Sequence, residues 1–154
     1  MIKEFLNKLL NNPFKDKAKI IGRVKIELFD KNGKVKLSKI FNTIETAGKD
    51  MICDRLLASP ALGVPTHMAI GTGTPSAGAL GIELDVNALT SKTRTDNVLT
   101  MVGDWAAGDG TGAITEASIK DGAAGNVHAT TSFDVINKGA ADTLKITWTW
   151  TIGA

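Results

Sequence analysis

The sequence predicts a mainly β fold: an antiparallel β-sandwich with one internal helix, at about residues 44–58, and a short amino-terminal amphipathic helix. First, apolar and polar residues alternate from Asp142 to Ile152, which is the period of a strand with one buried face. Second, several other short segments of this kind are separated by turn-forming residues. Third, only one interior segment has convincing helical spacing. We therefore expect an attachment arm over residues 1–17 and a single sandwich domain over residues 18–154.

The composition is that of a globular chain without disulfides. Of the 154 residues, 43% are hydrophobic and 22% are charged, which is enough for one core with an ordinary polar surface. No apolar run approaches the ~20 residues that cross a bilayer, and we expect no signal peptide. The single cysteine, Cys53, excludes an internal disulfide, and we expect it to be a small buried residue. No motif suggests a cofactor, so we expect none.

The charges are unevenly distributed along the chain. Residues 1–50 carry a net charge of +6 and residues 51–154 a net charge of −4, although the whole chain has only +2. Two interpretations are open: a solvated, lysine-rich surface, or a basic end that meets an acidic partner or stacks on the acidic end of another copy. No aromatic residues interleave with the lysines, so we expect no nucleic-acid partner.

Residues 1–12 have the pattern of a short amphipathic helix that ends at Pro13. A helix of this length is marginal alone, so its apolar stripe has to dock on another surface. That surface is either its own domain or a neighbouring subunit. Membrane association is a third alternative, but we expect no membrane partner. The stripe supplies our first candidate attachment residues: Ile2, Phe5, Leu6, Leu9 and Leu10.

Residues 18–29 and 34–41 predict a β-hairpin with one apolar and one mostly charged face. The dipeptide Asn32-Gly33 favours a type I′ turn, in which both central residues have positive φ. The second strand carries two further attachment candidates, Lys34 and Lys36, and such charges also guard a strand against uncontrolled edge pairing.

The internal helix over residues 44–58 begins near Thr43 or Thr46, either of which could cap it. Ser59-Pro60 ends it. Its expected buried stripe consists of Ala47, Met51, Ile52, Leu56 and Leu57.

The remaining elements are short strands and two glycine-rich loops. We expect the loops, over residues 71–81 and 106–112, to project from an end of the sandwich and pack against neighbouring molecules. The expected strands lie at 68–70, within 82–95, and at 98–105, 113–120, 126–136 and 144–152. Within 126–136, one face should consist of Val127, Ala129, Thr131, Phe133 and Val135.

We expect no enzyme and no catalytic residues. The run Gly71-Thr72-Gly73-Thr74-Pro75 lacks the lysine and the spacing of a phosphate-binding loop. His67 and His128 have no accompanying motif for a metal site, although one histidine from each of several symmetry-related chains could still bind a metal. The acidic residues Glu116, Asp121 and Asp134 form no recognisable catalytic pair, and no G-x-S-x-G motif is present.

The three tryptophans receive different interpretations. Trp148 and Trp150 lie on the apolar face of the last strand and are expected in the core or in an interface. Trp105 lies beside a glycine-rich loop and is our candidate for an exposed residue that stacks on a ligand.

Three segments together resemble a family of tailed-bacteriophage virion structural proteins. The first is H-M-A-I-G-T-G-T-P from His67, followed by A-L-G-I-E up to Glu83. The second is G-A-I-T-E-A-S-I from Gly112, and the third is D-T-L-K-I-T-W-T-W-T-I from Asp142, which follows Lys138. The order and spacing are similar over roughly residues 44–152. The chain departs from the family pattern after the first glutamate, where an arginine comes later, and after Glu-Ala, where Ser-Ile replaces Gly-Leu.

The resemblance implies an assembly role without catalysis. The chain would be made in the host bacterial cytoplasm and reside in the virion as a homo-oligomer. Its partners would be copies of itself and a larger tail, neck or capsid component. The alternative is a receptor- or carbohydrate-binding tip module of a phage fibre, with a host surface receptor or glycan as its partner.

Overall fold

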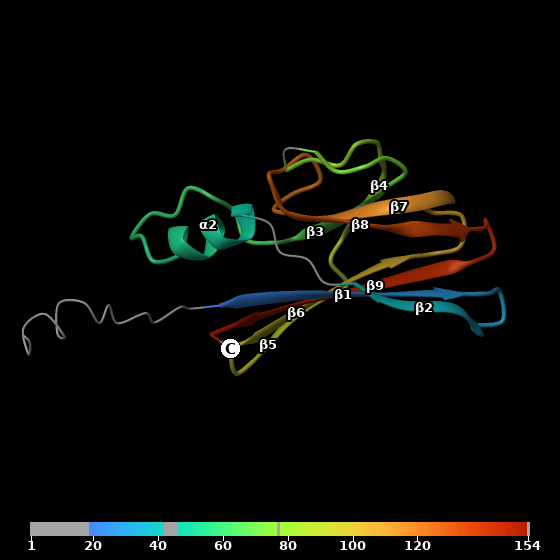
Figure 1. The fold of residues 1–154 in the computed structure, drawn as a ribbon, viewed down its shortest axis with the longest axis horizontal. Helices are drawn as coiled ribbons and strands as arrows, with labels where there is room; N and C mark the ends of the chain where they lie inside the picture. Colours follow the sequence, from blue (N-terminus) through green and yellow to red (C-terminus); the bar gives the residue numbers. More distant parts are fainter. Residues whose placement is uncertain (1–18, 42–45, 77, 154) are drawn as a thin grey trace, which may run out of the picture.

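The computed structural model describes residues 19–41, 46–76 and 78–153 (Figure 1). The expected amino-terminal helix and its five apolar residues lie outside these ranges.

The described part is built mainly from antiparallel strands. Its elements are β1 (Ile20–Phe29), β2 (Val35–Phe41), α2 (Thr46–Asp54), β3 (His67–Gly71), β4 (Glu83–Ala88), β5 (Ser91–Thr95), β6 (Val98–Trp105), β7 (Gly112–Lys120), β8 (Val127–Lys138) and β9 (Thr143–Ile152). Each expected strand is present, and the region 82–95 contains two.

The strands form two sheets that face each other, so the predicted β-sandwich is confirmed. One sheet has five strands in the order β2-β1-β9-β6-β5, and the other has four in the order β4-β3-β7-β8. Figure 1 shows the two layers edge-on, with α2 beside one end of the four-stranded sheet. The chain passes from one sheet to the other between β4 and β5, which belong to different sheets.

Strand β9 lies at the centre of the larger sheet, between β1 and β6. Its side chains alternate as the sequence predicts: Ile146, Trp148 and Trp150 are at most 1% exposed, while the threonines between them are half-buried on the outer face. Met101 and Ile26 on the neighbouring strands are opposite Trp148 and Ile146, respectively, and are fully buried. The core is thus formed by the inner faces of both sheets.

The turn of the first hairpin differs from the predicted type I′ turn. Among residues other than glycine in the described part, positive φ occurs only at Asp96, so Asn32 has negative φ. Gly33 has a φ of 76°, and its N–H donates to the carbonyl of Asp30 at 2.9 Å. The carboxylate of Asp30 accepts from the N–H groups of Asn32 and Lys34, both at 2.9 Å. This aspartate stabilises a longer loop with glycine in the left-handed position, so one positive φ suffices.

Helix α2 ends at Asp54, four residues before the predicted end. The carboxylate of Asp54 accepts from the N–H groups of Ala61, at 3.2 Å, and Leu62, at 2.8 Å, which folds the chain back on itself. Met51 is buried as predicted, but the prediction that Leu56 and Leu57 are buried is wrong. They lie in the turn after the helix, where they are 86% and 60% exposed.

The predicted five-residue face of β8 is also wrong at its end. Glu116 of β7 pairs with Ser132 of β8, and Ile114 of β7 pairs with Ile136 of β8. The two pairs are two residues apart on β7 but four residues apart on β8, so β8 contains two extra residues between them. The bulge changes which side chains face the core. Ile136 is buried and Val135 is 54% exposed.

The alternation along β9 gives the first testable prediction. Replacing Ile146 by alanine should lower the free energy of unfolding by about 2–5 kcal/mol, because it leaves a cavity in a fully buried site. The matched control is Ile152→Ala, on the same face of the same strand but 37% exposed, which should cost much less. Urea denaturation of both variants measures the difference, and equal losses would contradict the assigned face.

Candidate functional site

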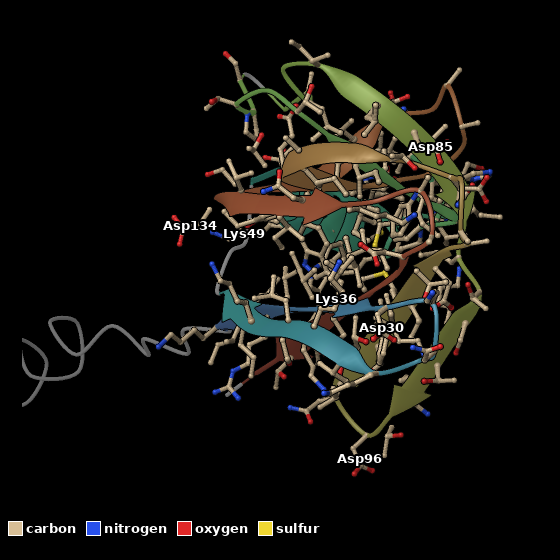
Figure 2. All side chains as sticks on the ribbon, turned by 90° about the vertical axis from the view of Figure 1, so that its right-hand side faces the viewer. Asp30, Lys36, Lys49, Asp85, Asp96 and Asp134 are labelled. Atoms are coloured by element: carbon tan, nitrogen blue, oxygen red, sulfur yellow. The ribbon has the colours of Figure 1, made fainter. Side chains whose placement is uncertain are left out.

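Lys34 and Lys36 are the two attachment candidates that the structure describes. Lys34 is exposed beside the hairpin turn. Lys36 instead donates from Nζ to Oδ2 of Asp142 at 2.6 Å, and Figure 2 looks directly at this end of the sandwich. The Lys36 hydrogen bond, with a second one from the N–H of Gly139, lowers the pKa of Asp142. Lys36 therefore connects the hairpin to the turn between β8 and β9.

Trp105 cannot serve as an exposed stacking residue, so that prediction is wrong. It is 1% exposed at the end of β6, where it is opposite Leu144 of β9 and contributes to the core. The following glycine-rich loop folds over its ring: a Cβ on Gly110 would lie 3.1 Å from Cδ1 of Trp105. The other two tryptophans are also buried, so no tryptophan ring is free to stack on a ligand.

Cys53 differs from its prediction as well, because it is an exposed free thiol at the end of α2. Within the described ranges, no three residues of the types His, Cys, Asp and Glu gather as metal ligands. In the same part of the chain, no helix has the length and apolar character needed to cross a bilayer.

The most highly organised polar site is a buried carboxylate, that of Glu116 on β7. This side chain is fully buried on the outer face of the four-stranded sheet. Its Oε1 accepts from the N–H groups of Gly73, at 2.8 Å, and Ile82, at 2.9 Å, and its Oε2 accepts from the N–H of Gly81 at 2.8 Å. Thr115 adds a fourth connection by donating from its hydroxyl to the carbonyl of Gly73 at 2.6 Å. We name residues 72–82 the clamped loop.

Glycine is required where the clamped loop closes on the carboxylate. A Cβ on Gly73 would lie 2.7 Å from the backbone nitrogen of Ile82, and one on Gly81 would lie 2.5 Å from the carbonyl oxygen of Thr74. The loop was expected to project toward neighbouring molecules, but both of its ends are held against its own sheet. In the sequence, Glu116 appeared only as an unpaired acid, because no local pattern indicates which backbone groups will surround it.

A second buried charge closes the end of the sandwich near the hairpin. Lys138 is 2% exposed and donates from Nζ to the carbonyl of Ala106 at 2.9 Å. Burial lowers the pKa of Lys138, although Asp109, Asp142 and Asp85 act in the opposite direction. The lysine thus holds the second glycine-rich loop, residues 106–112, over the core.

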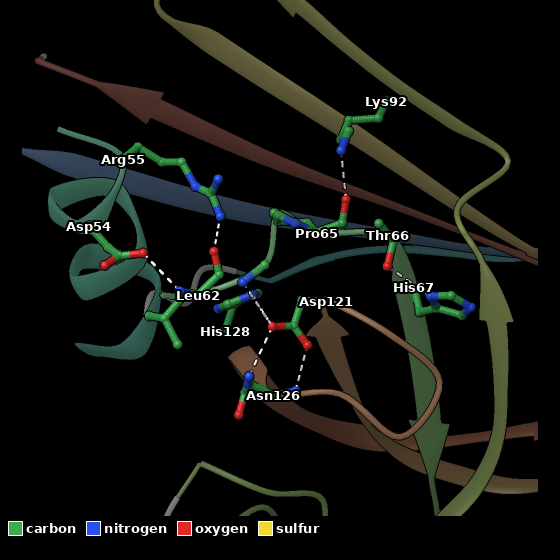
Figure 3. Close-up of polar contacts among 11 residues, drawn as sticks. Asp54, Arg55, Leu62, Pro65, Thr66, His67, Lys92, Asp121, Asn126 and His128 are labelled. Carbon is green, nitrogen blue, oxygen red and sulfur yellow. Dashed lines mark hydrogen bonds and ion pairs between the residues drawn. The ribbon is translucent and has the colours of Figure 1, made fainter. Parts of the chain in front are cut away.

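A third polar site joins α2 and its following loop to the four-stranded sheet (Figure 3). The carboxylate of Asp121 accepts from the N–H of Gly63 at 3.2 Å, and from the N–H and Nδ2 of Asn126 at 2.6 and 3.0 Å. Burial alone would raise the pKa of Asp121, but these hydrogen bonds and the nearby His128 outweigh it, so the pKa is lowered.

His128 is the buried member of this third site. It is 1% exposed, its Nε2 has no hydrogen-bond partner within the described residues, and the nearest carboxylate oxygen, on Asp121, is 3.7 Å away. Burial lowers the pKa of His128. Arg55 lowers it further, whereas Asp121 and the Gly63 backbone act in the opposite direction. This arrangement favours a neutral imidazole on β8, beside the loop that follows α2.

The outer face of the five-stranded sheet is the broadest polar surface. Arg23, Thr149, Thr100 and Thr93 lie side by side across β1, β9, β6 and β5. None of these four side chains is fully buried. Helix α2 packs against β8 of the other sheet and does not cover this face. This face presents hydroxyl groups and a guanidinium at the surface of the described residues.

The edge strands β2, β5 and β8 carry features that oppose uncontrolled pairing between copies. If two copies extended the larger sheet end to end, β2 of one copy would lie against β5 of the other. Lys36 and Lys39 on β2 would then face Lys92 and Arg94 on β5, and like charges repel. On the other sheet, α2 packs against β8, and Lys39 of β2 forms an ion pair with Asp134 of β8 at 3.3 Å. Figure 2 shows Asp134 on this margin of the sandwich. In the described part of the chain, the β4 edge has no comparable feature.

No protein-family model, no curated protein and no solved structure matches this chain. Its function has to be inferred from its own residues.

The Glu116 site gives a second testable prediction. Glu116→Gln should lower the free energy of unfolding by about 1.5–3 kcal/mol, because an amide NH2 would face backbone N–H donors and the charge-assisted bonds would be lost. Hydrogen exchange should accelerate at the amides of Gly73, Gly81 and Ile82. Glu27→Gln, on the outer face of the other sheet, is the control and should leave these amides unchanged. Unaltered exchange in Glu116→Gln would show that the carboxylate does not hold the loop.

His128 gives a prediction on pH. Because burial depresses its folded-state pKa, the unfolded chain takes up a proton first as the pH falls below the ordinary value of 6.5. The free energy of unfolding should therefore decrease from about pH 6.5 downward until the folded-state pKa is reached. His128→Gln should flatten this decrease, and His67→Gln is the matched control. If His128→Gln does not fold, an NMR titration of the His128 ring in the unaltered protein measures the same pKa, and a value at or above 6.5 would refute the prediction.

Proposed function

We propose that this chain is a non-catalytic structural subunit of a tailed-bacteriophage virion. It is made in the host bacterial cytoplasm, assembles with copies of itself, and docks on a larger tail, neck or capsid component. Neither nucleic acid nor membrane is among its proposed partners.

The observation that carries the proposal is the connection between separate segments that resemble virion proteins. Glu116, from the segment G-A-I-T-E-A-S-I, binds the backbone of Gly73, Gly81 and Ile82, from the segment that begins at His67. The third segment forms β9, the central strand of the opposite sheet. Residues on which the resemblance rests are therefore those that close the loop and fill the core, as expected if the resemblance reflects a shared fold.

The polar sites support a structural role because their groups are engaged in holding loops. Glu116 binds the clamped loop, Lys138 binds the second glycine-rich loop, and Asp121 binds the loop after α2. Each carboxylate is surrounded by backbone donors of its own chain, which leaves it poorly placed for proton transfer to a substrate.

The hairpin end and the polar face supply surfaces for contact. Residues 19–41 carry seven basic and two acidic side chains, so this part of the sandwich suits an acidic partner surface. Charged strand edges disfavour sheet extension, so we propose that copies meet through the outer face of the larger sheet.

The alternative, a receptor- or carbohydrate-binding tip of a phage fibre, depended on an exposed Trp105. With that ring buried in the core, no described residue specifically favours glycan binding. A glycan array with the purified full-length chain would revive this alternative if it showed binding.

A direct test is mass spectrometry of purified phage particles from a culture that expresses this gene. Peptides of the chain should co-purify with the particles through a density gradient. Their confinement to the particle-free fraction would refute the virion role.

The attachment role of residues 1–12 gives a further testable prediction. Deleting them should leave a folded domain, because every described strand lies between residues 20 and 152, but the truncated chain should no longer enter particles. Complementation of a phage that lacks the gene measures incorporation. The full-length variant Phe5→Ser/Leu9→Ser should fail in the same way, whereas Lys3→Ser/Lys8→Ser, on the polar face, should still be incorporated. Normal incorporation of the truncation would rule out this attachment role.

A further inference from the structure

The loop that follows α2 presents an exposed pair of leucines, Leu56 and Leu57, which we name the leucine pair. They are 86% and 60% exposed, and Leu56 is the most exposed large apolar side chain among the described residues. Burying such side chains is favourable, so an unpartnered pair at one end of a domain suggests a docking surface.

The leucine pair is held in place, because the loop that carries it is fixed to the rest of the fold. The carboxylate of Asp54 binds the backbone of Leu62, and the guanidinium of Arg55 donates to the carbonyl of the same residue. The N–H of Gly63 donates to the carboxylate of Asp121, which directly follows β7, as Figure 3 shows. The surrounding contacts thus pre-form an apolar surface that does not depend on a flexible loop.

The start of β1 lies at the same end of the sandwich as this loop. A Cβ on Gly48 of α2 would lie 3.3 Å from Cη2 of Trp150, and Trp150 pairs with Gly22 of β1. Lys19, the first described residue, accepts a hydrogen bond at its carbonyl from Gly153 at 2.7 Å. Figure 1 shows β1 beginning on the side where α2 lies.

The chain outside the described residues has the composition that the leucine pair requires. Residues 1–12 carry an apolar stripe at helical spacing, and residues 13–18 join it to Lys19. Six extended residues span at most about 20 Å, which sets how far from Lys19 the stripe can dock. A linker of this length also gives an effective concentration on the order of millimolar, which favours the chain's own surface over that of a second molecule.

We propose that the apolar stripe of residues 1–12 docks on the leucine pair of the same molecule. This inference does not rest on the virion role, since it concerns the free protein. In the docked state, both apolar surfaces are removed from water, and the arm and the loop after α2 stabilise each other. A partner that uses the same stripe has to displace the arm from this position.

Cys53 allows a direct test, because it is the only cysteine, is exposed, and lies three residues before Leu56. We would introduce Asn12→Cys into the full-length chain, three residues after Leu9 on the side of the stripe. Under mild oxidation, a disulfide with Cys53 should form within the monomer at a rate independent of protein concentration. Adding Leu56→Ser/Leu57→Ser should slow its formation at least about tenfold. The matched control Ile40→Ser, which removes a 70% exposed side chain from β2, should leave the rate unchanged.

Two outcomes would overturn the proposal. One is an equal rate with and without the leucine pair. The other is a disulfide that links two molecules and increases with protein concentration, which would place the arm on a second copy. Hydrogen exchange on the unaltered chain provides an independent readout: amides of residues 1–12 should be protected, and the protection should disappear in Leu56→Ser/Leu57→Ser. Circular dichroism of this variant checks that its sandwich is still folded.

Discussion

The burial of β9 between two facing sheets is the constraint on which the rest of the structure depends. Its isoleucine and tryptophan side chains are excluded from water, and this requires apolar partners on β1 and β6 and a second sheet opposite them. The three buried indole N–H groups have no hydrogen-bond partner within the described residues, so apolar packing has to outweigh the cost of desolvating them. Once β9 is central, its threonines necessarily face outward and create the polar surface proposed for assembly.

Polar groups inside the fold control the loops, whereas apolar groups build the layers. Glu116 closes the clamped loop, Lys138 closes the end beside the first hairpin, and Asp121 secures the loop after α2. Each of these groups is paired with the backbone, which is how a charged group is tolerated away from water. Within the described residues, a small sandwich thereby obtains well-defined loops without a disulfide or a long helix. Fixed loops of this kind are consistent with the structural role proposed above.

The surfaces available for contact divide into guarded and open ones. Like charges on β2 and β5 oppose extension of the larger sheet, and the pairing of Lys39 with Asp134 occupies part of the β8 edge of the smaller sheet. The threonine-rich face and the basic hairpin remain open, whereas the leucine pair is the proposed docking site of residues 1–12. Control over which surfaces can pair matters for a protein that assembles, because open strand edges would permit pairing without a defined end point.

The sequence by itself determined the strands, the layers and the identity of most core residues, because alternation of apolar side chains directly encodes which face of a strand is buried. It could not determine what surrounds Trp105, Glu116 or the end of α2. Trp105 is buried because β9, which is distant in sequence, and the loop that directly follows Trp105 enclose it, and Glu116 is buried because the backbone at Gly73, Gly81 and Ile82 closes over it. The bulge of β8 likewise depends on its pairing with β7. Only the tertiary structure decided these features, since long-range contacts, which leave no local pattern, set the environment of each side chain.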